Sequence, residues 1–312
     1  MSILVTGATG LLGSAVAKSF AQEGAQVRVV GRSAARLKNL YGDGTPAFPW
    51  DPATDAFPRE ALSGVHTVYQ MMGEPVGGRW TKAKKARIVT SRVTSAQKLA
   101  HALDGRSCRV IAASSFAIYP GRRGDVYDEK TRTGEPGTFI QGTIRAWENA
   151  ALSAVSGASK VTVIRFGMVC GPDGYPKKLV RLFKRGLGFI AGDGEQVVPI
   201  VDIEDAVAMM RWTADQGIDG VINCVSPQLP RFRDVAETIS RTLEKPVRLH
   251  IPNWLARPIL GGSADYFLLS YDIHPTRALA EGFTFRHTQP DAIFARALAP
   301  HRNSANHPSH MS

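Results

Sequence analysis

Short apolar runs alternate with amphipathic segments of helical period over the first half of the chain. The apolar runs have the length of buried strands, and the segments between them repeat apolar residues every three or four positions. Strands are expected at 3–5, 26–30, 47–50, 65–72, 109–113 and 161–166, and helices at 11–22, 81–103 and 138–156. This alternation predicts an α/β fold with a doubly wound parallel sheet of the Rossmann type.

The pattern is less regular after residue 166 and predicts a smaller C-terminal cap. Helices are expected at 177–185, 203–214 and 231–243, with a strand at 220–225. We expect a nucleotide-binding Rossmann domain at 1–165 that also receives 199–225, a mixed substrate and cap region at 166–300 with a C-terminal domain at about 250–298, and a disordered tail at 301–312. The tail is polar and aperiodic, so we interpret its histidines as disordered and not as a metal site: His301, His307 and His310.

A glycine-rich turn, TGATGLLG at 6–13, follows the first expected strand and opens the first expected helix. Gly7 allows a sharp turn, Gly10 lets the backbone approach a pyrophosphate, and Gly13 lets helix and strand pack closely. The start of the helix offers free N–H groups and a partial positive charge to an anion. The turn therefore predicts a dinucleotide site, against the alternative of a glycine-rich turn in another α/β fold. Its spacing is GxxGxxG and not GxGxxG.

Arg32 follows the second expected strand, about 20 residues after the glycine turn, where NAD-binding proteins place Asp or Glu for the ribose 2′-hydroxyl. An arginine at this place suits the 2′-phosphate of NADP, and Arg36 lies one helical turn later. The alternative is a solvated arginine at a strand end. Asp51 has two open interpretations, a contact with the adenine edge or the start of a turn with Pro52. NADP is the predicted cofactor.

The loop after the fourth expected strand should also line the cofactor crevice, because carboxyl ends of parallel strands border the ligand in doubly wound sheets. The backbone of Met71, Met72 and Gly73 is expected there. Glu74 either binds ribose hydroxyls or caps the loop. Ser115, after the fifth strand, either hydrogen-bonds a carbonyl or hydroxyl beside the nicotinamide or only ends the strand. Tyr119 either transfers a proton or packs before the turn at Pro120.

Composition narrows the possible partners. The net charge is +11, but the Lys and Arg residues are spread along the chain without interleaved aromatic residues, so an anionic cofactor and a solvated basic face are favoured over nucleic acid. The first strand starts at residue 2 and no apolar run reaches the roughly 20 residues of a membrane span, so we expect no membrane partner and a cytoplasmic location. Cys108, Cys170 and Cys224 lie in separate apolar contexts, and we expect them to be reduced and buried.

Several runs carry a family resemblance: GEPVGGRW at 73–80, SRV at 91–93, AWENAA at 146–151, RFGMVCGPDG at 165–174 and EGFTFR at 281–286. With the glycine turn, Ser115 and the helix at Asp205, the chain resembles an extended short-chain dehydrogenase/reductase. It is most similar to the atypical subgroup of epimerase-family proteins, which carry a small C-terminal domain of unknown function. The resemblance implies that Arg92 stands where the wider superfamily has a structural asparagine, and that Met168 borders the nicotinamide.

The resemblance also shows what this chain lacks. Short-chain dehydrogenases use a Tyr-x-x-x-Lys pair for proton transfer, and aligning the helix on Trp147-Glu148 places Ile140 and Ile144 at those positions. Gly142 and Asp202 replace a family-typical acidic residue and histidine. Arg92 is interpreted as a contact to cofactor ribose or phosphate, with an anionic substrate or a structural salt bridge as alternatives.

Two functions follow from these observations. One is an NADP-dependent oxidoreductase or epimerase that acts on a small-molecule substrate, for which an anion is one option. The other is a non-catalytic NADP-binding sensor or partner protein, since relatives in cyanobacteria and plastids are linked to cell or plastid division. The expected cofactor contacts are Gly7, Thr9, Gly10, Leu11, Leu12, Gly13, Gly31, Arg32, Met71, Met72, Gly73, Glu74, Arg92 and Met168. The expected catalytic residues are Ser115 and Tyr119, and the oligomeric state is not predicted.

Overall fold

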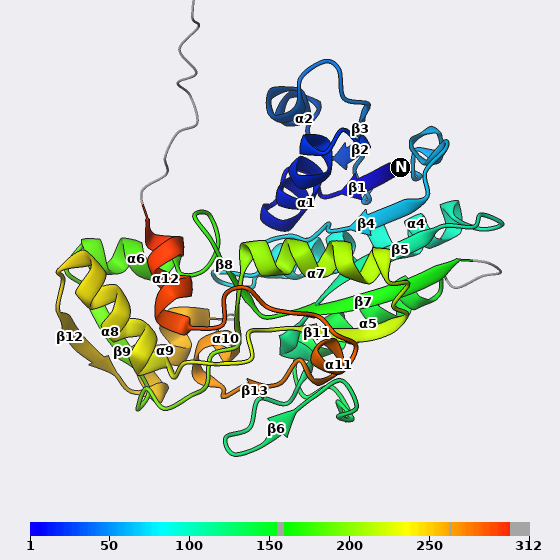
Figure 1. Cartoon of the computed structure of the whole chain (residues 1–312). Helices are drawn as coiled ribbons and strands as arrows, with labels where there is room; N and C mark the ends of the chain where they lie inside the picture. The colour runs from blue at the N-terminus through cyan, green and yellow to red at the C-terminus, as the bar shows by residue number, and fades with distance from the viewer. Residues whose placement is uncertain (155–158, 262–263, 300–312) are drawn as a thin grey trace, which may run out of the picture.

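A parallel sheet of seven strands forms the centre of the protein, in the order β11-β7-β5-β4-β1-β2-β3 (Figure 1). The computed structural model describes residues 1–154, 159–261 and 264–299. The strands of this sheet are β1 Ser2–Thr6, β2 Gln26–Gly31, β3 Ala47–Pro49, β4 Thr67–Gln70, β5 Arg109–Ser115, β7 Lys160–Phe166 and β11 Gly220–Cys224. The strand order reverses between β1 and β4, and ligands bind at such a switch point in doubly wound sheets.

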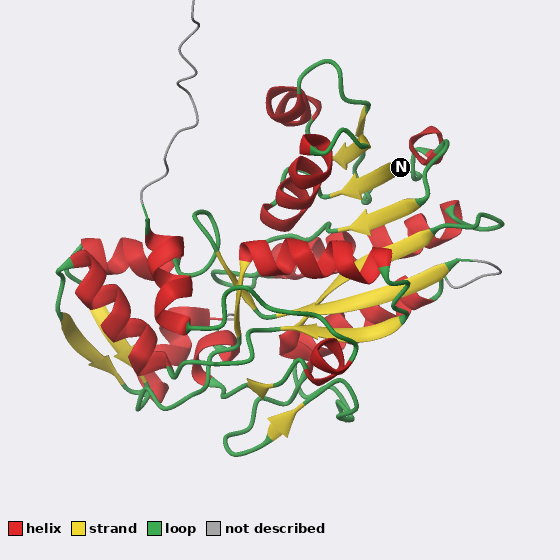
Figure 2. Cartoon of the chain, viewed as in Figure 1, coloured by secondary structure: helices red, strands yellow, loops and turns green. Residues whose placement is uncertain are grey.

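Helices cover both faces of the sheet, as the pattern of the sequence predicts (Figure 2). They are α1 Leu11–Gln22, α2 Ala34–Tyr41, α3 Lys82–Val89, α4 Ser95–Ala102, α5 Phe139–Leu152 and α7 Ile203–Asp215. Because side chains of a strand point alternately to either face, Ile3 and Val5 of β1 pack in a core with Phe20 of α1, whereas Leu4 packs in a second core with Leu99 of α4. The predicted doubly wound fold is confirmed.

The expected long helix at 81–103 is divided by a π-helical segment at Thr90–Thr94, which joins α3 to α4. A π segment widens the turn by changing the hydrogen-bond step, and such segments are frequent at functional sites. Arg92 lies at the middle of this segment. The local widening therefore determines where its guanidinium group emerges.

A smaller lobe built mainly from the C-terminal part faces the carboxyl ends of the strands (Figure 1). Its own core contains Phe183, Phe189, Phe232 and Phe294, each buried. Its elements are β8 Met168–Cys170 paired with β10 Ile200–Asp202, β9 Gly188–Ala191 paired with β12 Val247–Ile251, and the helices α6 Lys177–Lys184, α8 Phe232–Leu243, α9 Asn253–Leu260, α10 Asp265–Leu268 and α12 Pro290–Leu298.

The remaining elements are short. They are the 3-10 helices Arg59–Leu62 and Phe116–Ile118, the paired strands β6 Val126–Tyr127 and β13 Asp272–Ile273, and the helix α11 Thr276–Ala280. Buried Asp205 of α7 accepts the backbone N–H groups of Arg286 and His287, each at 2.9 Å, and so holds the EGFTFR segment on the sheet domain.

Of the segment 199–225, β11 joins the central sheet, but β10 pairs with β8 of the lobe. The expected tail at 301–312, with its three histidines, lies outside the described residues. Cys108, Cys170 and Cys224 are buried and free, as predicted. In the described part of the chain, no helix is both long and apolar enough to cross a membrane.

Candidate functional site

Two adjoining cavities lie at the carboxyl ends of the central strands. The first, of about 680 Å³, is lined mostly by apolar side chains and extends from Leu11 to Phe267 of the lobe. The second, of about 570 Å³, is lined by Arg32, Arg36 and Arg87 among others. We call them the apolar cavity and the basic cavity. Both are lined by four shared residues of the glycine turn and the loop after β4: Gly10, Met71, Met72 and Gly73.

The glycine turn fits a pyrophosphate at this junction. Gly7 has a φ of +65°, and a Cβ there would lie 2.6 Å from the carbonyl oxygen of Met71. A Cβ on Gly13 would lie 2.3 Å from the carbonyl oxygen of Gly7, so this glycine permits close packing and does not itself line either cavity. Gly10 is the N-cap of α1 and provides no side-chain cap, so the first N–H groups of the helix remain available to an anion.

The basic cavity gathers cations around Glu74. The Glu74 carboxylate pairs with Lys84 at 2.8 Å, Arg87 at 3.4 Å and Arg32 at 3.5 Å. The hydrogen bond from Lys84 lowers the pKa of Glu74, with Arg87 and Arg32 adding to the effect. The sequence suggested that Glu74 binds ribose or caps the loop; its observed contacts are ion pairs that hold cations at the rim. The Arg32 side chain remains 58% exposed and accessible to a ligand.

The other expected residues of this cavity are close together. Thr9, Gly31 and Asp51 line it with Arg32 and Arg36. Asp51 accepts the backbone N–H of Ala53 at 2.9 Å, so it forms the turn that the sequence suggested and also lies at the cavity.

Arg92 lines the apolar cavity from the π segment. Its Nη1 donates to the Glu74 carbonyl oxygen at 2.9 Å, and its guanidinium lies 5.2 Å from the centroid of the Trp147 ring. A Cβ on Gly73 would lie 3.2 Å from Nη2, so the guanidinium packs closely against this glycine. Burial lowers the pKa of Arg92, and among the described residues it forms no ion pair with a carboxylate. The structural salt bridge considered for Arg92 is therefore absent from the described part of the protein.

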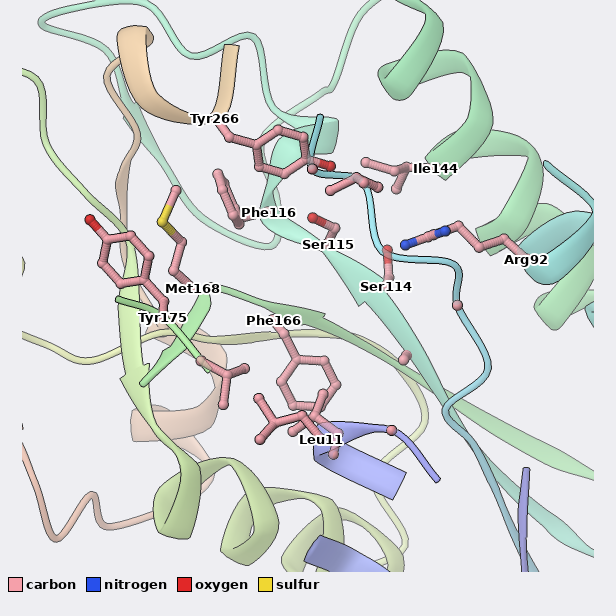
Figure 3. Close-up of a pocket in the computed structure, with 18 of the residues that line it drawn as sticks. Leu11, Arg92, Ser114, Ser115, Phe116, Ile144, Phe166, Met168, Tyr175 and Tyr266 are labelled. Atoms are coloured by element: carbon pink, nitrogen blue, oxygen red, sulfur yellow. The ribbon is translucent and has the colours of Figure 1, made fainter. Parts of the chain in front are cut away.

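Two serines end β5 at the polar side of the apolar cavity (Figure 3). Ser114 donates to Oε1 of Glu148 at 2.5 Å. Glu148 also accepts from Nε and Nη2 of Arg165, at 2.9 and 2.8 Å, in a buried ion pair between α5 and β7. The Ser115 hydroxyl accepts the backbone N–H of Ala117 at 3.3 Å. Leu11, Leu12 and Met168 line the same cavity.

Tyr119 lies away from both cavities. Its side chain is fully buried, and its hydroxyl lies 2.9 Å from the Asp128 carbonyl oxygen and 2.9 Å from Oδ1 of Asn223. It also accepts from Nη1 of Arg165 at 3.0 Å. Because its hydroxyl is fully engaged in this internal network, Tyr119 stabilises the packing of neighbouring segments and does not contact a ligand in either cavity. Our interpretation of Tyr119 as a proton-transfer residue is corrected accordingly.

A different tyrosine, Tyr266, reaches the site from the lobe. It lies on α10, lines the apolar cavity, and its ring packs edge-on against Phe116 with centroids 5.5 Å apart. Burial raises the pKa of Tyr266, and the charge of Arg92 and the nearby Ser115 hydroxyl oppose this effect. Tyr266 is not identifiable from the sequence, because no motif near residue 266 connects it to β5.

The positions of the lost Tyr-x-x-x-Lys pair are apolar in the structure as well. Ile144 lines the cavity beside Ser115, whereas Ile140 is buried in the neighbouring core. One group of described residues has metal-like spacing, Asp202, Glu204 and His287. Arg296 pairs with both of its carboxylates, so a cation already lies between them.

Comparison with known proteins identifies the family. The sequence model of the NAD dependent epimerase/dehydratase family matches residues 3–224. The chain belongs to this family. Its expected resemblance to epimerase-family proteins is thereby confirmed.

The similarity to known relatives extends over nearly the whole chain. An epimerase family protein of Mycobacterium leprae is 27% identical over 96% of this chain and 97% of the relative. The chloroplastic SDR39U1 homolog of Arabidopsis thaliana is 26% identical over 92% of this chain and 84% of the relative. Among solved structures, human epimerase family protein SDR39U1 (isoform 2) with NADPH superposes with a TM-score of 0.82 at 24% identity, covering 95% of this chain and 99% of that one. This last likeness shows a shared fold.

Proposed function

We propose that this protein binds NADP(H) across the two cavities and acts as an oxidoreductase or epimerase on a small molecule. The observation that carries the proposal is the junction itself. An uncapped helix start and a close-packed glycine turn lie between a cavity rimmed by arginines and a cavity that reaches the two serines of β5. When bound, NADP(H) supplies or accepts hydride at its nicotinamide ring.

The residues of the basic cavity are assigned to the adenosine half of the cofactor. Gly7, Thr9 and Gly31 line the cavity beside the adenosine, and Arg32 with Arg36 binds the 2′-phosphate. The N–H groups of Leu11, Leu12 and Gly13 at the start of α1 bind the pyrophosphate.

The residues of the apolar cavity are assigned to the nicotinamide half and the substrate. Met71, Met72, Gly73 and Met168 border the ring. Arg92 contacts ribose or phosphate on this side, since its guanidinium has free N–H groups and no carboxylate partner among the described residues. Ser115 hydrogen-bonds the reacting oxygen of the substrate. Glu74 positions Arg32 at one end and Arg92 at the other.

Calorimetric titration with NADPH and NADH tests the cofactor assignment. We expect NADPH to bind more tightly, and Arg32→Glu to reverse or abolish that preference, because it places a carboxylate against the 2′-phosphate. Arg241→Glu is the matched control, since Arg241 is 70% exposed on α8. An unchanged NADPH/NADH ratio in Arg32→Glu would refute the NADP assignment.

A second candidate is a non-catalytic NADP(H) sensor, which the apolar Ile144 at the lysine position favours. Absorbance of NADPH followed against a panel of carbonyl compounds and sugar nucleotides separates the two functions. Turnover that Ser115→Ala abolishes supports the enzyme. Tight NADPH binding with a thermal shift, and no oxidation across the panel, supports the sensor. Failure to bind any dinucleotide would exclude both.

A further inference from the structure

The geometry points to a substrate class: we propose that the apolar cavity takes an apolar ketone or aldehyde whose oxygen is held by the hydroxyls of Tyr266 and Ser115. The inference rests on the proposed NADP(H) function and narrows its substrate. It also assigns the proton-donating role to a residue of the lobe, in place of the absent tyrosine of α5.

Apart from the phenols of Tyr175 and Tyr266, the wall of the cavity that the lobe contributes is apolar. Leu179, Leu182, Phe189 and Phe267 line this end, with Met168 at the boundary. Among the described lining residues, Arg92 is the single charged group, and it lies at the sheet end. A sugar nucleotide would bring a diphosphate and a polar base into this space, and burying such groups without partners is costly. An apolar skeleton matches the wall instead.

The polar groups converge at the opposite end. Figure 3 shows the Tyr266 hydroxyl directed toward the side of the cavity where Ser115, Ile144 and Arg92 lie. The edge-on contact with Phe116 fixes the ring, so the hydroxyl is presented at a defined place. A carbonyl oxygen has two lone pairs, so it accepts from both hydroxyls while its apolar skeleton packs against the lobe.

The protonation state of Tyr266 suits a donor. Burial raises its pKa to about 12, while the charge of Arg92 and the hydrogen bond from Ser115 act in the opposite direction. Near neutral pH the phenol is therefore protonated. A phenol is a much weaker acid than a carboxylic acid, so Tyr266 gives up its proton only as negative charge develops on the substrate oxygen.

The proposed reaction is reduction of the carbonyl compound to an alcohol, with NADPH as the reductant. As the carbonyl carbon gains hydride, the electron pair of the C=O π bond moves to oxygen and forms a bond to the proton of Tyr266. Ser115 donates to the same oxygen and stabilises its developing charge. Solvent water then returns a proton to the phenolate, so the sum is carbonyl plus NADPH plus a proton giving alcohol plus oxidised cofactor.

Three probes test the cavity without turnover. Benzylacetone is an apolar ketone, butylbenzene is the same skeleton with a methylene in place of the carbonyl, and UDP-glucose represents the sugar nucleotides. Their affinities are measured by ligand-observed NMR on the full chain, with and without NADPH. The variants are Tyr266→Phe, which keeps the ring packed on Phe116, and Tyr271→Phe as control. Tyr271 also packs on Phe116, with centroids 4.8 Å apart, but does not line the cavity.

We expect benzylacetone to bind about 3- to 10-fold more tightly than butylbenzene, the range of one net hydrogen bond. Tyr266→Phe should reduce that difference, because only the Ser115 hydroxyl then remains to donate, while Tyr271→Phe keeps it. With NADPH, we expect Tyr266→Phe to lower kcat for benzylacetone by about 10²- to 10⁴-fold, the usual worth of a positioned acid, with NADPH affinity unchanged. Equal affinities for ketone and hydrocarbon in the wild-type protein would overturn the inference, as would preferred binding of UDP-glucose. Loss of NADPH binding alone would instead refute the proposed function, because the ketone comparison is also made without cofactor.

Discussion

Replacing Glu148 with alanine should destabilise the protein more than any exposed ion-pair change. The side chains of Glu148 and Arg165 are 7% and 8% exposed. The carboxylate accepts two N–H groups of Arg165 together with the Ser114 hydroxyl. Burial opposes the charge on Arg165, but its contacts with Glu148 outweigh that effect and raise its pKa. Without Glu148, the guanidinium stays charged in the core with the Tyr119 hydroxyl as its remaining acceptor.

The expected loss follows from this geometry. Removing one partner of a buried pair costs about 3–5 kcal/mol, because the other charge is left uncompensated. A natural protein of this kind has about 5–15 kcal/mol in total, so Glu148→Ala removes a large fraction of its stability. Replacing both partners with apolar residues, Glu148→Leu with Arg165→Met, should recover most of the loss, since no charge then remains in the core.

Urea denaturation followed by circular dichroism measures these free energies of unfolding. The control is Glu135→Ala, which breaks the pair with Arg145; the Glu135 side chain is 96% exposed, and the expected change is within about 0.5 kcal/mol. If Glu148→Ala costs no more than Glu135→Ala, the network is not the source of stability that we describe.

Two further predictions concern the cofactor site. Gly13→Ala places a Cβ 2.3 Å from the Gly7 carbonyl oxygen, so α1 must shift, and NADPH affinity should fall by roughly tenfold or more, since binding geometry tolerates little displacement. Gly44→Ala, whose Cβ meets nothing within 4 Å, should leave the calorimetric affinity unchanged. The lowered pKa of Glu74 means that its ionised form stabilises the folded state; this contribution is present above its ordinary pKa of 4.5 and is lost as pH falls through the folded value. Glu74→Gln should therefore lose less stability on acidification than the wild-type protein in urea denaturation at a series of pH values, and equal slopes would contradict the ion pairs.

The fold and the cofactor turn are predictable because their signals are local. The order strand, glycine turn and helix at 3–22 lies within one βα unit, and Gly10 and Gly13 make their close contacts inside that unit. Arg32 is predictable for the same reason, since it follows the end of β2 directly. In each case the residues that form the contact are adjacent or nearly adjacent in the sequence.

The polar end of the apolar cavity is not predictable in this way. Tyr266 meets Ser115 through the packing of the lobe, which no periodicity near either residue encodes. Tyr119 is closer to Ser115 in sequence, but the turn after β5 directs it into the buried network with Arg165. The π segment at 90–94 was likewise hidden, because its residues continue a helical pattern.

The two ends of the site are mechanically joined through one residue. The side chain of Glu74 holds Arg32 in the basic cavity, and its main-chain carbonyl holds Arg92 in the apolar cavity. A substitution at Glu74 removes the carboxylate that holds Arg32 but keeps the backbone carbonyl that accepts from Arg92. Cofactor preference is therefore open to engineering through the side chain at position 74 while the anchor of Arg92 is retained.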